Sequence, residues 1–400
     1  MPKDTIAFIS TYEHPSRDSV ERTIRTAFPE YRVENIHLLD VIKRHRGWIA
    51  PNLWYVMREY GPQLLSRTET LRDSYLRTTY LFRQIQQAMR AVIDSERHVF
   101  SFQTQSLYDT SVPGVPHFIY TDHTHLSNRR WPGFEAHRLR SKKWIALERC
   151  IYENARCVFT RSDHVTADVI RHYEIDPRKV ECVFAGSNVL PGSGAPLQND
   201  NYGNRTVLFV GSDWVRKGGP VLAEAFERVL VAHPDARLVI AGAQPGLGLR
   251  NCTVLGPVSL EDLANQYARA SVFCLPTRLE PFGIAVLEAM AYRLPVVATR
   301  AGAIPEMVED GVTGCLVAPD DVEGLAGALI ALLGDAARCR TLGEAGHRRA
   351  IGTYTWQRVG ERLRTRILPE IAVPSALAGT AGAVAEPRRA HLPLRAETTG

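Results

Sequence analysis

The sequence predicts an α/β protein that contains two doubly wound domains. The chain has 400 residues, a length that favours about two domains. Short apolar runs rich in Val, Ile and Phe alternate with helical patterns in two separate stretches, and a segment rich in Gly, Pro and Asn lies between them. This alternation is typical of βαβ units whose parallel sheet is covered by helices on both faces.

Residues 1–189 are expected to form the N-terminal domain. Its strand-like runs are Thr5–Ser10, Arg97–Gln103, Pro116–Thr121, Ala155–Thr160 and Val180–Ala185. Between about residues 45 and 95 the alternation breaks, and apolar residues recur at near-helical spacing with arginines between them. We interpret this region as one or two inserted amphipathic helices. They either pack against the sheet or contact an acceptor or a membrane surface, with Trp48 and Trp54 as anchors in the second case.

Residues 190–204 read as a linker, and residues 205–352 as a second domain of the same kind. The strand-like runs of the second domain are Thr206–Gly211, Arg237–Gly242, Cys252–Leu255, Val272–Pro276, Pro295–Thr299 and Gly314–Val317. Two such domains should face one another across a cleft, because open α/β sheets bind ligands at the carboxyl ends of their strands. Residues 353–372 are expected to form a terminal helix, and residues 373–400, which lack periodicity, a disordered tail.

Composition argues against several functional classes. The net charge is +5 and basic residues occur along the whole length, which favours a solvated surface over a nucleic-acid interface. No run approaches the roughly 18 apolar residues that would span a membrane, and we expect no secretory signal. The seven cysteines are scattered and include no C-x-x-C pair, which argues against a disulfide framework or zinc site. A cytoplasmic location is therefore expected, with the inner face of the membrane as the open alternative.

The most informative stretch follows the run Val272–Pro276. It reads Arg278-Leu-Glu280-Pro-Phe-Gly283-Ile-Ala-Val-Leu-Glu288-Ala-Met-Ala. Pro281 and Gly283 suit a turn that opens a helix, and the free N–H groups of that helix would form an anion site. Glu280 and Glu288 lie around this helix start. Two ionised carboxylates can accept hydrogen bonds from two hydroxyl groups of one ligand.

This stretch resembles the Glu-x7-Glu motif of family 4 glycosyltransferases. These are retaining, nucleotide-sugar-dependent enzymes of the GT-B type, in which two Rossmann-like domains face one another. The resemblance implies that Glu280 contacts the transferred sugar and that Glu288 contacts the ribose. The other donor-binding residues that it implies in this half of the domain are Val258, Phe282, Gly283 and Ile284, with the backbone N–H groups of the last two meeting the donor phosphate.

A second stretch, Val210-Gly211-Ser-Asp-Trp-Val-Arg216-Lys217-Gly218-Gly219, follows another predicted strand. A glycine turn brings backbone close to an anion, and Lys217 supplies a point charge. The stretch resembles the family's phosphate-binding loop, in which a lysine before glycine faces the diphosphate, and so it places Gly211 in the donor site. The family usually has arginine directly after the first glycine, where this chain has Ser212. Either Arg216 replaces that charge, or the donor phosphate is bound more weakly.

Further motifs agree with the family. The stretches Arg300–Glu306 and Asp310–Pro319 are similar to its Gly-Gly-Ile-Pro-Glu and Gly-x-x-Gly-Leu-Leu-Val-x-Pro patterns. Thr353-Tyr-Thr-Trp356 matches the Phe-Ser-Trp that opens the family's terminal helix, which implies a helix that crosses back onto the first domain.

The first domain resembles the family less closely. Phe118-Ile-Tyr-Thr-Asp122-His123-Thr-His125 ends a predicted strand where family members carry a histidine that contacts the donor sugar, so His123 is the candidate and His125 the second choice. Ser162 is expected to be a helix N-cap. The Ser10–Pro15 loop lacks the family's glycine pair, which predicts an unusual acceptor side.

The resemblance thus implies a metal-independent, retaining glycosyltransferase with Glu280, His123 and Lys217 as catalytic residues. The donor would be a UDP- or GDP-sugar, and the acceptor a sugar, a lipid-linked saccharide or a small molecule, with no nucleic acid and no cofactor. Peripheral contact with a membrane stays open. The alternatives are a nucleotide-sugar epimerase on the same fold, a glycoside hydrolase that uses Glu280 and Glu288, and a non-catalytic nucleotide-sugar-binding protein.

Overall fold

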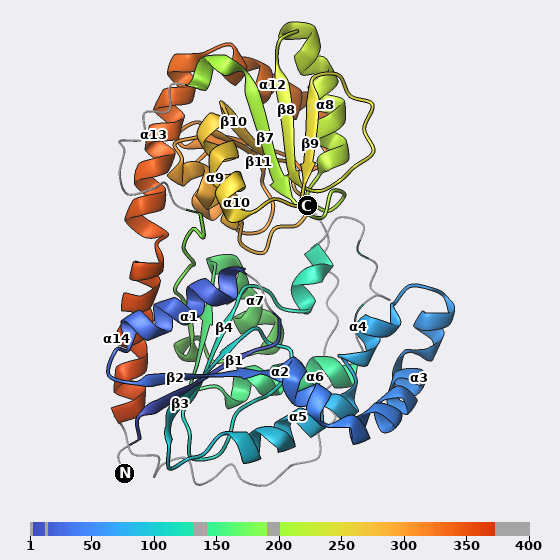
Figure 1. Ribbon diagram of the computed structural model, residues 1–400, viewed down its shortest axis with the longest axis vertical. Helices are drawn as coiled ribbons and strands as arrows, with labels where there is room; N and C mark the ends of the chain where they lie inside the picture. Colours follow the sequence, from blue (N-terminus) through green and yellow to red (C-terminus); the bar gives the residue numbers. More distant parts are fainter. Residues whose placement is uncertain are drawn as a thin grey trace.

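The computed structural model describes residues 3–12, 15–130, 134, 139, 142–189 and 201–372. These residues form two lobes, each built around a six-stranded parallel sheet, and the lobes lie one above the other in Figure 1. The prediction of two doubly wound α/β domains is therefore confirmed. Most of the predicted linker, residues 190–200, and the predicted tail, residues 373–400, lie outside the described residues.

The sheet of the N-terminal lobe has the strand order β2-β1-β3-β4-β5-β6. Its strands are β1 (Thr5–Ser10), β2 (Arg32–His37), β3 (His98–Thr104), β4 (His117–Thr121), β5 (Cys157–Thr160) and β6 (Val180–Cys182). The sequence prediction missed β2, which pairs with β1 alone and is half exposed. An edge strand buries little surface, so its sequence, Arg-Val-Glu-Asn-Ile-His, contains no apolar run.

The helices of this lobe are α1 (Pro15–Ala27), α2 (Leu38–Arg44), α3 (Ile49–Leu65), α4 (Leu71–Tyr75), α5 (Thr79–Val92), α6 (Lys142–Asn154) and α7 (Asp163–Tyr173). The insertion near residues 45–95 contains three α-helices, α3 to α5, so the expectation of one or two was too low. Thr70 and Thr78 explain the difference, because each hydroxyl caps a new helix by accepting a hydrogen bond from a backbone N–H three residues on. Apolar spacing alone does not reveal such breaks.

Short 3₁₀ helices also occur in both lobes. They are η1 (Arg46–Trp48), η2 (Leu126–Arg130), η4 (Pro177–Lys179) and η5 (Asn201–Asn204), the last within the segment that was predicted to be a linker.

The sheet of the C-terminal lobe has the order β12-β11-β10-β7-β8-β9. Its strands are β7 (Thr206–Gly211), β8 (Arg237–Gly242), β9 (Cys252–Gly256), β10 (Val272–Leu275), β11 (Val296–Thr299) and β12 (Gly314–Val317), and each was predicted to within about one residue. Strands β7 and β10 are neighbours although β8 and β9 intervene in the sequence, so the strand order reverses between them. Ligands of open α/β sheets bind at such a reversal, outside the carboxyl ends of the strands.

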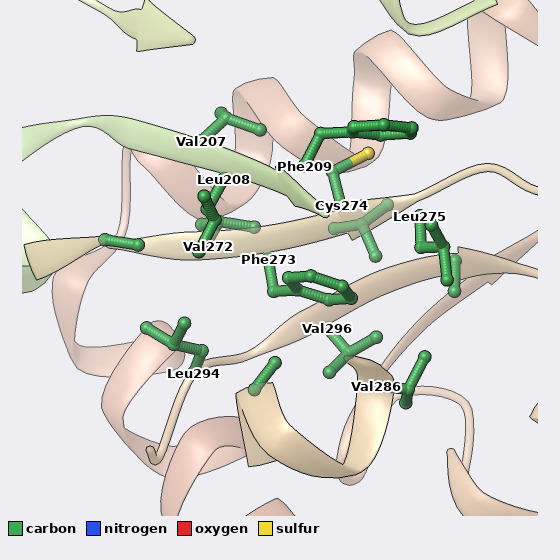
Figure 2. Close-up of a cluster of buried hydrophobic side chains, with 14 of the residues drawn as sticks. Val207, Leu208, Phe209, Val272, Phe273, Cys274, Leu275, Val286, Leu294 and Val296 are labelled. Atoms are coloured by element: carbon green, nitrogen blue, oxygen red, sulfur yellow. The ribbon is translucent and has the colours of Figure 1, made fainter. Parts of the chain in front are cut away.

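The centre of this lobe is apolar on both faces of the sheet. Figure 2 shows side chains of β7, β10 and β11 packed against one another and against Val286 and Leu294. All of the labelled residues are at most 1% exposed. The continuous apolar runs that revealed these strands in the sequence thus reflect burial by helices on both faces.

The helices of the C-terminal lobe are α8 (Gly219–Ala232), α9 (Leu260–Arg269), α10 (Ile284–Ala291), α11 (Ile304–Met307), α12 (Val322–Leu333) and α13 (Ala336–Thr353), and α14 (Trp356–Ala372) follows them. Figure 1 shows α13 and α14 running along one side of both lobes. Helix α14 packs on α1, and its buried Val359, Leu363 and Ile367 belong to the core of the N-terminal lobe. The predicted crossover of the terminal helix is confirmed, with its start at Trp356.

In the described part of the chain, no helix combines the length and the apolar character that crossing a membrane requires.

Candidate functional site

Two loops of the C-terminal lobe meet where the strand order reverses. One follows β7 and carries Lys217, and the other follows β10 and carries Glu280. The ammonium group of Lys217 and the carboxylate of Glu280 form an ion pair, although the residues are 63 positions apart in the sequence. Their side chains are only 14% and 7% exposed. Charges this deeply buried are costly unless they are paired, so the contact holds the two loops together.

Backbone contacts fix the same two loops. The carbonyl of Arg216 accepts a hydrogen bond from the Arg278 N–H at 2.9 Å. The Arg216 guanidinium donates to the Leu279 carbonyl at 2.9 Å and to the Asp213 carboxylate at 3.2 Å. Arg216 therefore joins the loops from its backbone and from its side chain. Whether it also meets a donor phosphate stays a prediction.

Two glycines allow the backbone segments to approach this closely. Gly218 has φ +77, and a Cβ placed there would lie 1.7 Å from the Pro276 carbonyl oxygen. Gly302 has φ +55, and its Cβ would lie 1.9 Å from the Glu280 carbonyl oxygen. A side chain at either position would push away the segment that carries Glu280.

Helix α10 begins at Ile284, four residues after Glu280. Its N-cap is Gly283, at φ +112, and Val286 makes the first backbone hydrogen bond of the helix, to the Gly283 carbonyl at 2.9 Å. The backbone N–H groups of Gly283 and Ile284 lie before the first hydrogen-bonded residue of the helix. The predicted anion site requires N–H groups in this position. The helix dipole adds positive potential close to Lys217.

The other predicted donor residues vary in exposure. Ser212 is exposed, Gly211 lies against the Lys217 side chain, Val258 is half-buried on the core of the lobe, and Phe282 is buried near the Tyr354 ring. The burial of Phe282 means that its contribution to a donor pocket would come mainly from its backbone.

Glu288 lies in a different environment from Glu280. Its carboxylate accepts hydrogen bonds from the Tyr267 hydroxyl at 2.8 Å and from the backbone N–H groups of Asn188 and Val189. Burial raises the pKa of Glu288 to about 7, and these hydrogen bonds oppose the rise. The structure joins Lys217 to Glu280 and directs Glu288 to the segment that leaves the N-terminal lobe. The ribose contact of Glu288 stays a prediction.

On the N-terminal side, His123 lies half-buried in the loop after β4. Its Nε2 is 3.0 Å from the Asn128 Oδ1, and its backbone is bonded to Thr121. The His125 ring packs edge-on against Trp144, with ring centroids 5.3 Å apart. His123 is thus bonded to polar neighbours, whereas His125 packs against an aromatic ring.

The loop that carries His123 is held by two buried residues that the sequence reasoning missed. Glu148 accepts a hydrogen bond from the His125 N–H at 3.0 Å, and the Tyr173 hydroxyl accepts one from the Leu126 N–H at 3.1 Å. Tyr173 also donates to Glu148. Burial raises the pKa of Glu148 to about 7. The available signal was its place on the apolar face of α6, four residues after Trp144 and three before Ile151.

Glu306 connects the two lobes. Its carboxylate accepts hydrogen bonds from the backbone N–H groups of Asp163 and His164, at 2.8 and 2.7 Å. These groups lie in the first turn of α7, where the helix dipole favours a negative charge. Ser162 caps the same helix by accepting from the Val165 N–H, as the sequence predicted. The helices that follow β5 and β11, at the carboxyl ends of the two sheets, therefore touch.

Two cavities, of about 680 and 810 Å³, lie beside α14 and share Ser187, Trp356 and Gln357 in their walls. Neither is lined by Lys217, Glu280 or His123. Among the described residues there is no group of three or more His, Cys, Asp or Glu side chains arranged to hold a metal ion.

Part of the chain matches a known protein family. Residues 204–335, which contain Lys217, Glu280 and Glu288, match the family described as "Glycosyl transferases group 1". This segment is therefore similar to group 1 glycosyltransferases.

Curated relatives carry glycosyltransferase names. A D-inositol 3-phosphate glycosyltransferase of Corynebacterium kroppenstedtii is 31% identical over 229 residues, or 49% of this chain and 50% of the relative. A GDP-mannose-dependent monoacylated alpha-(1-6)-phosphatidylinositol monomannoside mannosyltransferase of Corynebacterium glutamicum is 37% identical over 169 residues, or 38% of this chain and 44% of the relative. The matched part of the chain thus spans about half the length of these relatives or less.

The structural comparison extends over both lobes. Sucrose-phosphate synthase from Thermosynechococcus elongatus superimposes with a TM-score of 0.68 at 20% identity, which covers 92% of this chain and all of that chain. At this identity the similarity establishes the fold. It is the two-domain GT-B fold of glycosyltransferases, as predicted.

Proposed function

We propose that the protein is a retaining, metal-independent glycosyltransferase. It would move a sugar from a UDP- or GDP-sugar to a sugar, a lipid-linked saccharide or a small-molecule acceptor, in the cytoplasm and in peripheral contact with a membrane. The observation that carries the proposal is the buried Lys217–Glu280 pair at the strand-order reversal, next to the start of α10, within the segment that is similar to group 1 glycosyltransferases.

In this proposal the residues stabilise the leaving nucleoside diphosphate. Negative charge grows on the phosphate as its bond to the sugar breaks, and the Lys217 ammonium and the N-terminus of α10 would stabilise that charge. The acceptor oxygen forms a new bond to the same carbon on the same face. Its proton passes to the departing phosphate oxygen, so no protein nucleophile is required.

The Lys217–Glu280 ion pair would have to change when a donor binds. The Lys217 ammonium is paired with the Glu280 carboxylate. A diphosphate near Lys217 would compete for the ammonium group, because it offers more negative charge. Glu280 would then be released to accept hydrogen bonds from hydroxyl groups of the transferred sugar. We therefore propose that donor binding exchanges one partner of Lys217 for another.

The arrangement argues against the hydrolase alternative. A glycosidase needs two carboxyl groups that flank the bond to be cleaved. Here Glu280 pairs with Lys217, while Glu288 accepts hydrogen bonds from Tyr267 and from the chain between the lobes. The two glutamates therefore serve different parts of the molecule.

The test begins with the donor. A thermal-shift screen against UDP- and GDP-sugars selects the donor, because a ligand that binds the folded state raises the melting temperature. Transfer is then measured as nucleotide release with candidate acceptors, with and without excess EDTA, and the anomeric configuration of the product is read by NMR. We expect transfer that survives EDTA and retains configuration.

Other outcomes separate the alternatives. Loss of activity in EDTA that Mg²⁺ restores would contradict metal independence. Conversion of the donor sugar without an acceptor would indicate an epimerase. Donor binding without turnover on any acceptor would indicate a binding protein.

A further inference from the structure

Helix α3 carries an exposed apolar stripe. Ile49, Leu53 and Met57, spaced four residues apart, are 48%, 40% and 59% exposed, and Trp54 beside them is 55% exposed. Residues four apart lie on one face of a helix, so these side chains form a continuous surface. We call Ile49, Leu53, Trp54 and Met57 the α3 surface.

A row of buried residues directly beside the α3 surface fixes the helix to the lobe. Asn52 donates a hydrogen bond to the Tyr75 carbonyl at 2.9 Å, and the Tyr60 hydroxyl donates to the Arg77 carbonyl at 2.6 Å. Both residues are buried. The helix is therefore held with the α3 surface outward, and the exposure does not come from a loosely packed element.

Exposed apolar side chains are concentrated in this region. Of the fourteen large hydrophobic residues that are exposed in the described part of the chain, seven lie between residues 49 and 92. Single exposed apolar residues are ordinary on a protein surface, but a contiguous group marks an interaction site.

The same region carries an excess of positive charge. Residues 43–90 contain nine Lys and Arg against three Asp and Glu, a net charge of +6, whereas the whole chain has +5. The rest of the chain therefore has a net charge of −1. Residues 338–366 carry a similar excess, eight Arg against two Glu, but only the excess at residues 43–90 surrounds the exposed apolar α3 surface. Lys43, Arg44 and Arg46 directly precede α3, and the Arg58 guanidinium lies 5.2 Å from the Trp54 ring centroid.

We propose that the α3 surface docks onto an anionic lipid bilayer. Apolar side chains of an interfacial helix enter the boundary between headgroups and acyl chains, and nearby Lys and Arg are attracted to anionic headgroups. Trp54 suits this boundary, because indole has an apolar body and a polar N–H. A second copy of the chain is a poorer occupant, since pairing two such regions would bring like charges together.

The position of α3 is compatible with docking. Figure 1 shows α3 and its neighbours on the side of the lower lobe opposite α14. A bilayer at this side would leave the crossover between the lobes uncovered. This proposal rests on the membrane contact in the proposed function, but docking is measured without turnover, so a failure of docking and a failure of glycosyl transfer are distinguishable.

The experiment is flotation of the full chain with vesicles. Vesicles of phosphatidylcholine alone are compared with vesicles of equal parts phosphatidylcholine and phosphatidylglycerol, at low and high salt. We expect at least about tenfold tighter binding to the anionic vesicles, weakened by salt, because exposed charges are screened. Equal binding to both vesicles, or no binding to either, overturns the proposal.

Variants test the surface itself. Leu53→Gln combined with Met57→Gln should lower vesicle affinity by about tenfold or more, since two apolar side chains lose their burial. The matched control, Val231→Gln combined with Leu260→Gln, removes two exposed apolar residues of the other lobe and should leave affinity unchanged. Equal affinity of the α3 variant and wild type overturns the proposal. So does a concentration-dependent dimer that the α3 variant abolishes when no vesicle binding is seen.

Discussion

In the C-terminal lobe close backbone contact is added to the side-chain contacts of Arg216 and Lys217 in positioning the site loops, whereas the N-terminal lobe holds its loop with buried side chains. After β7 and β10, Gly218 and Gly302 let backbone segments touch where any Cβ would collide. After β4, the loop of His123 is held by Glu148 and Tyr173, which lie on α6 and α7. Backbone approach is encoded in a short local motif, while side-chain anchoring depends on residues that are distant in the sequence. The first kind of site tolerates few substitutions, and the second should lose function gradually.

The largest expected effect on activity comes from adding a side chain where two backbone segments are in close contact. Gly218→Ala should lower kcat/KM by at least about a hundredfold, because the new Cβ would lie 1.7 Å from the Pro276 carbonyl oxygen and displace the loop of Lys217. The measurement is steady-state transfer with the donor found by thermal shift.

Gly311→Ala is the matched control for backbone strain. Gly311 has the same φ of +77, but no heavy atom lies within 4 Å of the position that a Cβ would take there. Both substitutions share the conformational penalty, of about 1 kcal/mol, so their difference isolates the collision. Similar losses in the two variants would show that strain, and not loop contact, controls the site.

Removal of the lysine charge should have the next largest effect. Lys217→Ala should reduce transfer by more than about tenfold, on the scale of a lost charged contact of about 1.5–3 kcal/mol. It also leaves Glu280 buried without its cation, so Glu280→Gln and the double variant are measured alongside. If the residues act as one unit, the double variant loses less than the product of the two single losses. Wild-type kinetics in Lys217→Ala would refute the donor-site assignment.

The same contrast explains what the sequence could predict. In the C-terminal lobe the central strands β7, β10 and β11 are largely buried and produce apolar runs. The glycine motif and the Glu-x7-Glu motif begin in the loops that follow β7 and β10. The sequence could therefore predict that Lys217 and Glu280 lie in the same site. The interlobe bond of Glu306 and the contacts of Glu288 with Asn188 and Val189 could not be predicted, because they join segments about a hundred or more residues apart in the sequence. Strand β2 and the number of inserted helices were missed because an edge strand and a threonine cap leave no apolar pattern.

The buried carboxyl of Glu288 predicts a pH-dependent stability difference. Its folded-state pKa of about 7 lies above its ordinary value of 4.5, so the folded protein holds a proton that the unfolded chain has lost between these values. Its contribution to stability therefore falls as pH rises from about 4.5 to 7. Glu288→Gln should match wild type near pH 4.5 and exceed it near pH 8, by about 3 kcal/mol or several degrees in melting temperature.

Glu148 titrates in the same range but is present in both proteins, so its effect cancels in this comparison. A difference in melting temperature that does not change with pH would contradict the raised pKa of Glu288. The affinity of the same variant for UDP or GDP tests the predicted ribose contact, which a purely structural Glu288 would leave unchanged.

The smallest expected effect lies in the N-terminal lobe. Tyr173→Phe removes the acceptor of the Leu126 N–H bond and one donor to Glu148, a loss of about 1 kcal/mol. Tyr152→Phe is its control, because the Tyr152 hydroxyl bonds the Ser106 Oγ at 2.9 Å and lies 3.4 Å from Glu148 but does not bond the loop of His123. We expect a few-fold lower kcat/KM for Tyr173→Phe and less change for Tyr152→Phe. Equal kinetics in the two variants would mean that the loop keeps its position without the Tyr173 hydroxyl, and side-chain anchoring would then not distinguish this lobe from the other.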